Sequence, residues 1–207
     1  MARWLGVLML ETRFERLPGD VGHAASWRMP VRYRKVAGAS PQRVVRDSDA
    51  SLLRPFIDAA RALQSEGARA ITTSCGFLIR WQDELKAALD VPVWTSSLLA
   101  LPVLPRPGVI TVDAHSLPPL PVPVEGLAPG CSLQRTLLDD LPTLDVHAAE
   151  ADTVAAARRL VERHPEVESL VLECTNLPPY AAAVERATGR PVHHLMTFVH
   201  ERWKALR

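Results

Sequence analysis

Two of the three cysteines in this 207-residue chain occur in matching surroundings. Cys75 follows the apolar run ARAITTS and Cys174 follows ESLVLE, and a helical pattern begins soon after each cysteine. Such runs are typical of buried parallel strands, and open α/β sheets bind their ligands at the carboxyl ends of these strands. We therefore expect both thiols at the ligand-binding edge of a sheet.

A thiol in this setting can act as an acid, a base or a nucleophile. The helix expected after each cysteine should place the positive end of its dipole near the sulfur, which favours thiolate over thiol. Thr175 or Asn176 can cap the second helix, and the free N–H groups of a helix start could hold a substrate carboxylate. Alternatively, a single cysteine at a strand end is often a small buried apolar residue, although the matched pair weakens that interpretation.

Apolar runs and helical patterns alternate along the chain. Strands are predicted at the apolar runs 4–10, 68–74, 91–94, 108–112 and 168–173. Helices are predicted where apolar residues recur every three or four positions, at 52–67, 77–89, 153–164 and 180–189. This alternation predicts an α/β fold with mainly parallel sheets. Residues 13–48 and the proline-rich segment 117–130 do not fit the pattern and are predicted to be surface loops or lids.

The order of these elements is repeated in the two halves of the chain. Each half holds a helix, a strand, a cysteine, a second helix and a strand that begins at a proline. Cys75 and Pro92 are 92 − 75 = 17 residues apart, and Cys174 and Pro191 are 191 − 174 = 17 residues apart. We predict two similar lobes. The first comprises residues 1–95 with a C-terminal helix at 196–207 and carries Cys75, and the second comprises residues 96–195 and carries Cys174.

Composition and missing motifs exclude several classes of protein. The 24 Lys and Arg residues balance the 23 Asp and Glu residues and are interspersed with them, so no nucleic-acid or membrane-binding surface is indicated. No transmembrane run or signal-peptide pattern is present, and a cytoplasmic location is expected. The cysteines form no CxxC pair, which indicates reduced thiols. The signatures of dinucleotide oxidoreductases, P-loop NTPases and serine hydrolases are absent from the sequence.

The sequence around both cysteines resembles the aspartate/glutamate racemase superfamily, which includes hydantoin racemases and maleate isomerases. The motifs that carry the resemblance are ITTSCGF and LECTNLPPY, supported by GVLMLETRFERLPGD and GVITVDAHSL. The resemblance extends over nearly the whole chain. It implies an α/β fold of two pseudo-symmetric three-layer lobes with mainly parallel sheets and an active-site cleft between them. It also implies that Cys75 and Cys174 face each other across a bound substrate.

The activity implied by this resemblance is that of a cofactor-independent racemase or epimerase. Its substrate would be a small carboxylate or cyclic carbon acid, of the amino-acid or hydantoin type. Inversion of a carbon centre needs a base on one face and an acid on the other, so one thiolate and one thiol suit the reaction. A maleate isomerase or decarboxylase that uses one thiol, and a non-catalytic protein that binds a metabolite, are alternatives with the same fold.

The first cysteine motif differs from that of amino-acid racemases, which have Asn-Thr after the cysteine where this chain has Gly76 and Phe77. Phe77 indicates a less polar pocket, suited to a cyclic or aromatic acid or a hydantoin. The candidate catalytic residues are Cys75 and Cys174. The candidate substrate-binding residues are Glu11, Thr12, Ser74, Gly76, Phe77, Asp113, Thr175 and Asn176.

The remaining polar residues have simpler interpretations. The arginines of RFERL and RYRK are interpreted as solvated or loop-anchoring, and Cys131 as structural. His193 and His194 are adjacent on a predicted strand and point to opposite faces, so no metal site is expected. Asp113 suits a turn as well as a cleft. We expect a small-molecule substrate, no cofactor and no nucleic-acid or membrane partner, and the resemblance leaves a homo-oligomer open.

Overall fold

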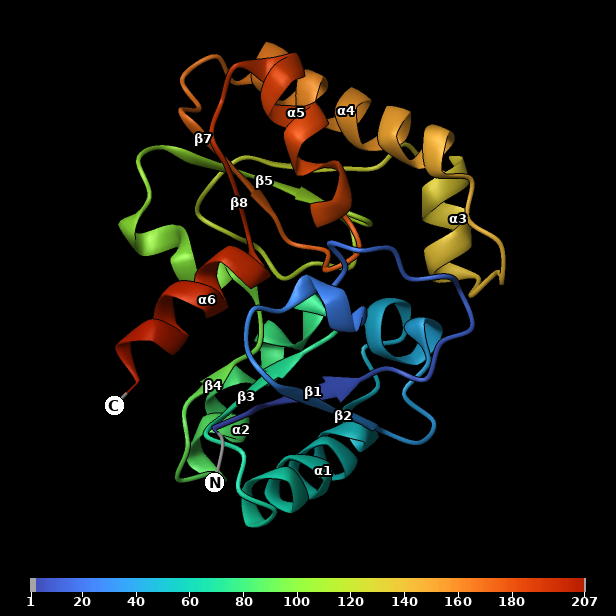
Figure 1. Cartoon of the computed structure of the whole chain (residues 1–207). Helices are drawn as coiled ribbons and strands as arrows, with labels where there is room; N and C mark the ends of the chain where they lie inside the picture. The colour runs from blue at the N-terminus through green and yellow to red at the C-terminus, as the bar shows by residue number, and fades with distance from the viewer. Residues whose placement is uncertain (1–2, 207) are drawn as a thin grey trace.

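The computed structural model describes residues 3–206 and shows two α/β lobes, one above the other in Figure 1. The strands of the first lobe are β1 (Leu5–Met9), β2 (Val31–Lys35), β3 (Ala70–Thr73) and β4 (Val93–Trp94). Those of the second lobe are β5 (Pro107–Thr111), β6 (Val124–Gly126), β7 (Ser169–Leu172) and β8 (Val192–His194). The α-helices are α1 (Leu53–Ser65), α2 (Gln82–Ala87), α3 (Ser132–Leu138), α4 (Val146–Arg163), α5 (Ala181–Thr188) and α6 (Leu195–Ala205).

Shorter helical segments connect these elements. Single turns or short stretches of 3-10 helix cover Ala24–Ser26, Ala50–Leu52, Gly76–Trp81, Ser97–Val103 and Pro178–Tyr180, and a π-helical turn covers Gln42–Arg46. The helix predicted at 77–89 is therefore divided into a 3-10 segment and α2, whereas the helix predicted at 153–164 begins earlier, at Val146.

The two sheets have the same topology. The strand order is β2-β1-β3-β4 in the first sheet and β6-β5-β7-β8 in the second, and all pairs are parallel. These orders become identical when each lobe is numbered from its own first strand. The predicted two-lobe α/β fold with mainly parallel sheets is confirmed, and the duplication in sequence is a duplication of structure.

A glycine in the first strand of each sheet allows a helix to pack closely against it. A Cβ atom at Gly6 would lie 3.0 Å from Leu63 Cδ1 of α1, and one at Gly108 would lie 2.7 Å from Leu160 Cδ2 of α4. Both separations are too short for comfortable packing in a dense interior. The glycines that open GVLML and GVITV therefore serve the same packing function in the two lobes.

Two strands lie in segments that the sequence pattern predicts to be loops, so that prediction is wrong for these stretches. β2 lies within 13–48 and pairs residue by residue with β1, while β6 lies within the proline-rich 117–130 and pairs with β5. Both are edge strands that keep partly exposed side chains. An edge strand buries too little apolar surface to produce a continuous apolar run in the sequence.

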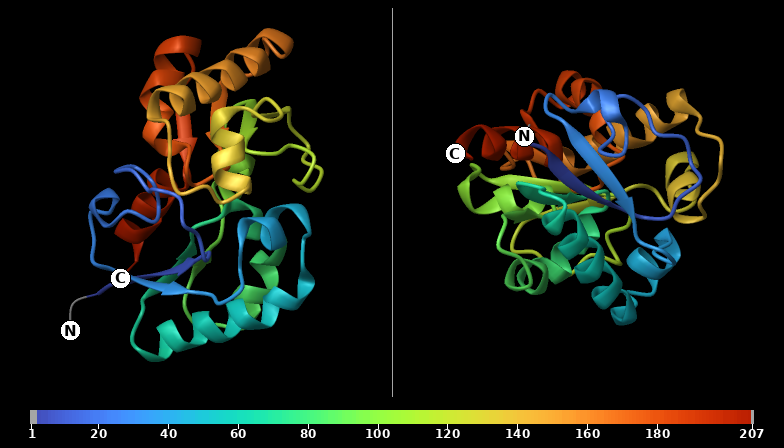
Figure 2. Two further views of the ribbon diagram at one scale, coloured as in Figure 1. Left: turned by 90° about the vertical axis from the view of Figure 1, so that its right-hand side faces the viewer. Right: turned by 60° about the horizontal axis from the view of Figure 1, so that its bottom comes forward.

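The C-terminal helix α6 packs against the first lobe, although it follows the last strand of the second (Figure 2). Its buried residues Leu195, Met196 and Val199 share a core cluster with side chains of β1 and with Trp94. The chain therefore passes between the lobes twice, through Ser97–Val103 and at the start of α6, and these two segments contact each other. No helix within residues 3–206 is long and apolar enough to cross a membrane.

Leu195→Ala should lower the free energy of unfolding by about 2–5 kcal/mol, because it leaves a cavity where α6 meets the first sheet. Val103→Ala is the control, since Val103 is 76% exposed and its truncation should change stability by less than about 0.5 kcal/mol. Urea unfolding followed by circular dichroism measures both. Equal stability of the two variants would contradict the packing of α6 on the first lobe.

Candidate active site

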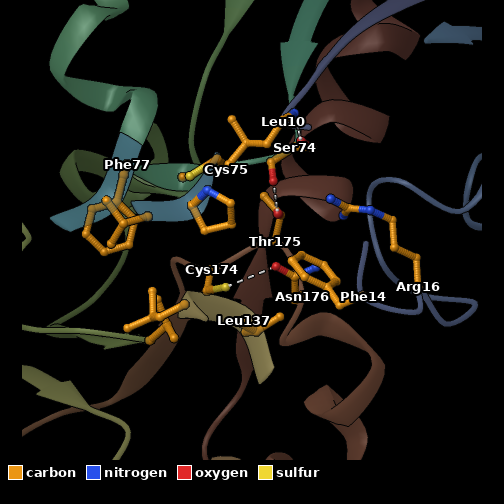
Figure 3. Close-up of a pocket in the computed structure, with 15 residues that line it drawn as sticks. Leu10, Phe14, Arg16, Ser74, Cys75, Phe77, Leu137, Cys174, Thr175 and Asn176 are labelled. Carbon is orange, nitrogen blue, oxygen red and sulfur yellow. Dashed lines mark hydrogen bonds between the residues drawn. The ribbon is translucent and has the colours of Figure 1, made fainter. Parts of the chain in front are cut away.

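The two cysteines lie at equivalent points of the two sheets and line one pocket between the lobes. Cys75 lies two residues beyond the end of β3, and Cys174 lies two residues beyond the end of β7. Figure 3 shows them on opposite sides of this space, which we call the cysteine pocket. Its lining residues are Leu10, Phe14, Arg16, Pro41, Val45, Ser74, Cys75, Gly76, Phe77, Val112, Leu137, Leu138, Cys174, Thr175 and Asn176.

The cysteine pocket is small and mostly apolar. Its cavity is about 30 Å³, which is roughly the space for two or three water molecules. Both thiols are buried, and Phe77 and Arg16 lie at opposite ends of the pocket (Figure 3). An aromatic side chain therefore lies at one end of the pocket and a guanidinium at the other.

Reciprocal contacts join the backbones that carry the two cysteines. The Thr175 hydroxyl, next to Cys174, donates a hydrogen bond of 2.6 Å to the carbonyl oxygen of Ser74, next to Cys75. On the other side, Gly76 faces Glu173 so closely that a Cβ on Gly76 would overlap the carbonyl oxygen and a carboxyl oxygen of Glu173. Position 76 therefore has no room for a side chain, because the carboxyl and the carbonyl group of Glu173 occupy the space beside it.

Arg16 is the one cationic side chain among the described residues that line the cysteine pocket. Its side chain is only 12% exposed and, of the two interpretations given to the RFERL arginines, Arg16 fits the loop-anchoring one. Nη1 donates to Asp20 Oδ1 at 2.8 Å and Nη2 donates to Thr12 Oγ1 at 3.0 Å. The guanidinium also lies 4.8 Å from the centre of the Phe14 ring. Arg16 is a fixed cation that sequence reasoning missed.

A chain of hydrogen bonds leads from Arg16 to Cys174. Asp20 is buried and accepts hydrogen bonds from Arg16 through Oδ1 and from the Asn176 amide nitrogen through Oδ2. This contact turns Asn176 Oδ1 toward Cys174, whose sulfur donates to it at 3.5 Å. Because an amide oxygen can only accept, this arrangement favours Cys174 in its protonated form.

Burial makes both thiols weaker acids than a free cysteine. Desolvation, and secondly the negative charge of Glu173, raises the pKa of Cys75 to about 12. The same two causes raise the pKa of Cys174 well above its usual value. The expected lowering by a helix dipole is wrong, because each cysteine precedes a 3-10 segment or turn instead of a long α-helix, and the loss of solvation outweighs the nearby N–H groups.

The opposing effects differ between the two thiols. The positive charges of Arg80 and Arg16 and the N–H group of Phe77 lower the pKa of Cys75. The pKa of Cys174 is lowered only by the N–H group of Asn176 and is raised by Cys75 and Asp20. Positive side chains therefore oppose the rise in the pKa of Cys75, whereas the groups that shift the pKa of Cys174 within residues 3–206 include no such cation.

Three of the candidate substrate-binding residues lie outside the cysteine pocket. Glu11 accepts a hydrogen bond of 3.0 Å from the N–H of Gly38, and Thr12 supports Arg16. Asp113 accepts hydrogen bonds from His115 and Ser116 in a turn and lines a separate cleft on the second lobe. Within residues 3–206, no group of three or more His, Cys, Asp or Glu side chains is placed to hold a metal ion.

We compared the chain with known protein families and with curated sequences, and the relatives described below share one name. No family model matches the chain. A dimethylsulfoniopropionate lyase of Durusdinium sp. clade D is 29% identical over 216 residues, which cover 91% of this chain and 70% of that protein. Dimethylsulfoniopropionate lyase 7 of Emiliania huxleyi (strain CCMP1516) is 28% identical over 225 residues, covering 93% of this chain but only 64% of that protein. These relatives extend beyond the region they share with this chain.

Solved structures with the same fold belong to proteins that are named for other reactions. A double mutant of arylmalonate decarboxylase in a liganded form superposes with a TM-score of 0.64 and 18% identity, over 99% of this chain and 92% of that one. Allantoin racemase from Klebsiella pneumoniae gives a TM-score of 0.60 and 13% identity, over 99% of this chain and 89% of that one. At such low identity these matches establish the fold alone.

Thr175→Val should destabilise the protein by about 1–3 kcal/mol, because it leaves the buried carbonyl of Ser74 without its partner. Thr175→Ser keeps the hydroxyl and should retain most of the stability, which makes it the matched control. Thermal and urea unfolding of the two variants measure the difference. If the Thr175→Val and Thr175→Ser variants were equally stable, the hydrogen bond between the lobes would contribute nothing to the free energy of unfolding.

Proposed function

We propose that this chain, which has the fold of the aspartate/glutamate racemase superfamily, is a lyase in which Cys75 removes a proton from the carbon next to a substrate carboxylate. The substrate we propose is dimethylsulfoniopropionate or a close β-sulfonium carboxylate. The main observation behind this proposal is that two buried thiols and one fixed arginine line the same small pocket. The relatives named dimethylsulfoniopropionate lyase, which match more than nine-tenths of the chain, support this choice of substrate.

Arg16 is the anchor for the substrate carboxylate. A guanidinium has five N–H donors, and Asp20 and Thr12 each accept one from Arg16. The other donors are available to a carboxylate, and the contacts with Asp20 and Phe14 hold the guanidinium in place before the substrate binds. A charge-assisted bond from a fixed arginine is both strong and directional.

The opposite end of the cysteine pocket suits a sulfonium group. Phe77 offers an aromatic side chain there, and a cation is attracted to the face of an aromatic ring. None of the lining residues that the structure describes is acidic, so the cation would not be held by an ion pair. Its positive charge would instead favour the thiolate form of a nearby cysteine, which offsets the burial that raises the pKa of both thiols.

The two cysteines take different roles in this proposal. Cys75 is assigned as the base, since the N–H group of Phe77 and the positive charges of Arg80 and Arg16 oppose the rise of its pKa. Its thiolate takes the proton next to the carboxylate, the C–H electron pair forms the new C=C bond, and the C–S bond breaks with its electrons leaving on sulfur. The products are acrylate, dimethyl sulfide and a Cys75 thiol, which returns its proton to solvent. Cys174 stays protonated on Asn176 and need not react.

Racemisation is the second candidate, and the placement of two thiols in one pocket favours it. With a substrate that lacks a leaving group on the β-carbon, the carbanion formed by Cys75 can take a proton from Cys174 on the opposite face. The hydrogen bond to Asn176 keeps that proton on Cys174. The early steps of the two reactions are the same, and the substrate decides the outcome.

Cys75→Ser should reduce acrylate release from dimethylsulfoniopropionate by about 10²-fold or more, because a serine hydroxyl is a far weaker acid than a thiol and supplies no base. Cys174→Ser should retain activity within about tenfold if the reaction is elimination. Proton NMR of the vinyl signals measures both. Cys131→Ser is the control, since Cys131 lies outside the pocket.

Proton NMR and polarimetry together distinguish elimination from racemisation. Hydantoins and 2-substituted acids are incubated in D2O, and loss of the α-proton signal and of optical rotation is followed. Racemisation that disappears in both Cys75→Ser and Cys174→Ser, with no acrylate from the sulfonium substrate, would replace elimination by inversion. Full elimination activity in Cys75→Ser would contradict the assignment of the base.

Arg16→Gln should raise KM for the carboxylate substrate by about 10- to 100-fold, because a hydrogen bond to a charged group contributes about 1.5–3 kcal/mol. Arg16→Lys keeps the charge and should be affected less. Steady-state kinetics measures KM and kcat for both. Arg54→Gln is the control, as Arg54 lies on α1 and is 75% exposed. An unchanged KM in Arg16→Gln would place the carboxylate elsewhere.

A further inference from the structure

Glu173 is a buried carboxyl group that the proposed reaction does not use. It is fully buried, directly precedes Cys174, and lies where β7 ends against the first lobe. Oε2 accepts a hydrogen bond of 2.7 Å from the Thr111 hydroxyl, whereas Oε1 has no hydrogen-bond partner. An ionised carboxylate with a bare oxygen is costly in a dry interior, so this arrangement suits the neutral acid.

The position of Glu173 is fixed by both lobes. The register that sets Ile110 opposite Leu172 brings Thr111 beside Glu173, and the missing side chain of Gly76 makes room for Oε1. The carboxyl therefore lies next to Gly76 on one side and next to Cys174 in sequence. The titratable and charged groups that face it are Cys75, Cys174 and Arg80.

We propose that Glu173 is a positioning residue that controls whether a thiolate can form at Cys75 or Cys174. In this inference, which rests on the proposed function, the carboxyl is neutral while a thiolate forms and suppresses that thiolate when it ionises. It touches neither the substrate nor the cavity, because it lies behind the lining residues. Its effect on the reaction passes through Cys75 and Cys174.

The physical reason is that two anions in one poorly solvated site repel each other. Burial raises the pKa of Glu173 to about 8, while Thr111 and Arg80 oppose that rise. Below pH 8 the carboxyl is mostly neutral and does not hinder thiolate formation. Above pH 8 it becomes ionised, and its charge raises the pKa of both thiols. Thiolate should therefore increase with pH less steeply than for an isolated buried cysteine.

The test is the rate at which iodoacetamide alkylates Cys75 in a chain that carries Cys131→Ser and Cys174→Ser, followed by mass spectrometry from pH 6.5 to 9.5. Adding Glu173→Gln should leave the rate unchanged at pH 6.5. At pH 9.5 the rate should rise by about three- to tenfold, which corresponds to a pKa of Cys75 lowered by roughly half to one unit. Equal rates at pH 9.5 with and without Glu173→Gln would overturn the proposal.

Thr111→Val provides a second variant that keeps the carboxyl and removes the hydrogen bond that stabilises its charge. Glu173 then stays neutral to higher pH, so alkylation near pH 8.5 should be faster than in the parent. If Glu173→Gln does not fold, this variant decides, and an unchanged rate overturns the proposal. Alkylation needs no substrate, so a chain that shows this pH response but releases no acrylate contradicts the proposed function alone.

Discussion

The arrangement of the cysteine pocket depends on the buried carboxylate of Asp20. One of its oxygens fixes Arg16, and the other fixes Asn176, which belongs to the opposite lobe. Asp20 thereby fixes the position of the Arg16 guanidinium relative to the Asn176 amide, whose oxygen accepts a hydrogen bond from Cys174. A buried carboxylate needs such partners, and Asp20 finds them in its own loop, at Arg16 and the Gly22 N–H group, and across the lobes at Asn176.

A dry pocket has opposite effects on the chemistry it supports. Exclusion of water strengthens the attraction between Arg16 and a carboxylate, but it also raises the pKa of Cys75 and Cys174. The protein supplies little positive charge to offset this rise, and Glu173 adds to it. In the proposed reaction the sulfonium charge of the substrate offsets this rise, which a neutral hydantoin could not do.

Sequence patterns predict the parts of this protein that repeat or that are buried on both faces. The apolar runs of β3 and β7, and the equal spacing after Cys75 and Cys174, are enough to place the two thiols at equivalent strand ends. Edge strands and loops carry no such signal, although Val31 and Tyr33 alternate with arginines in β2. Arg16 and Glu173 act through contacts between segments far apart in the sequence, so neither spacing nor periodicity reveals them.

The two passages of the chain between the lobes make the two sides of the molecule mechanically different. The Ser97–Val103 segment and the start of α6 lie together on one side of the molecule, and α3 lies on the other (Figure 1). Both covalent connections between the lobes therefore lie away from α3. On the α3 side the lobes are joined by exposed ion pairs, Arg13 with Asp140 and Arg46 with Asp139, which contribute little to stability. The lobes are therefore joined by weak ionic contacts beside α3, whereas both covalent passages of the chain lie on the opposite side.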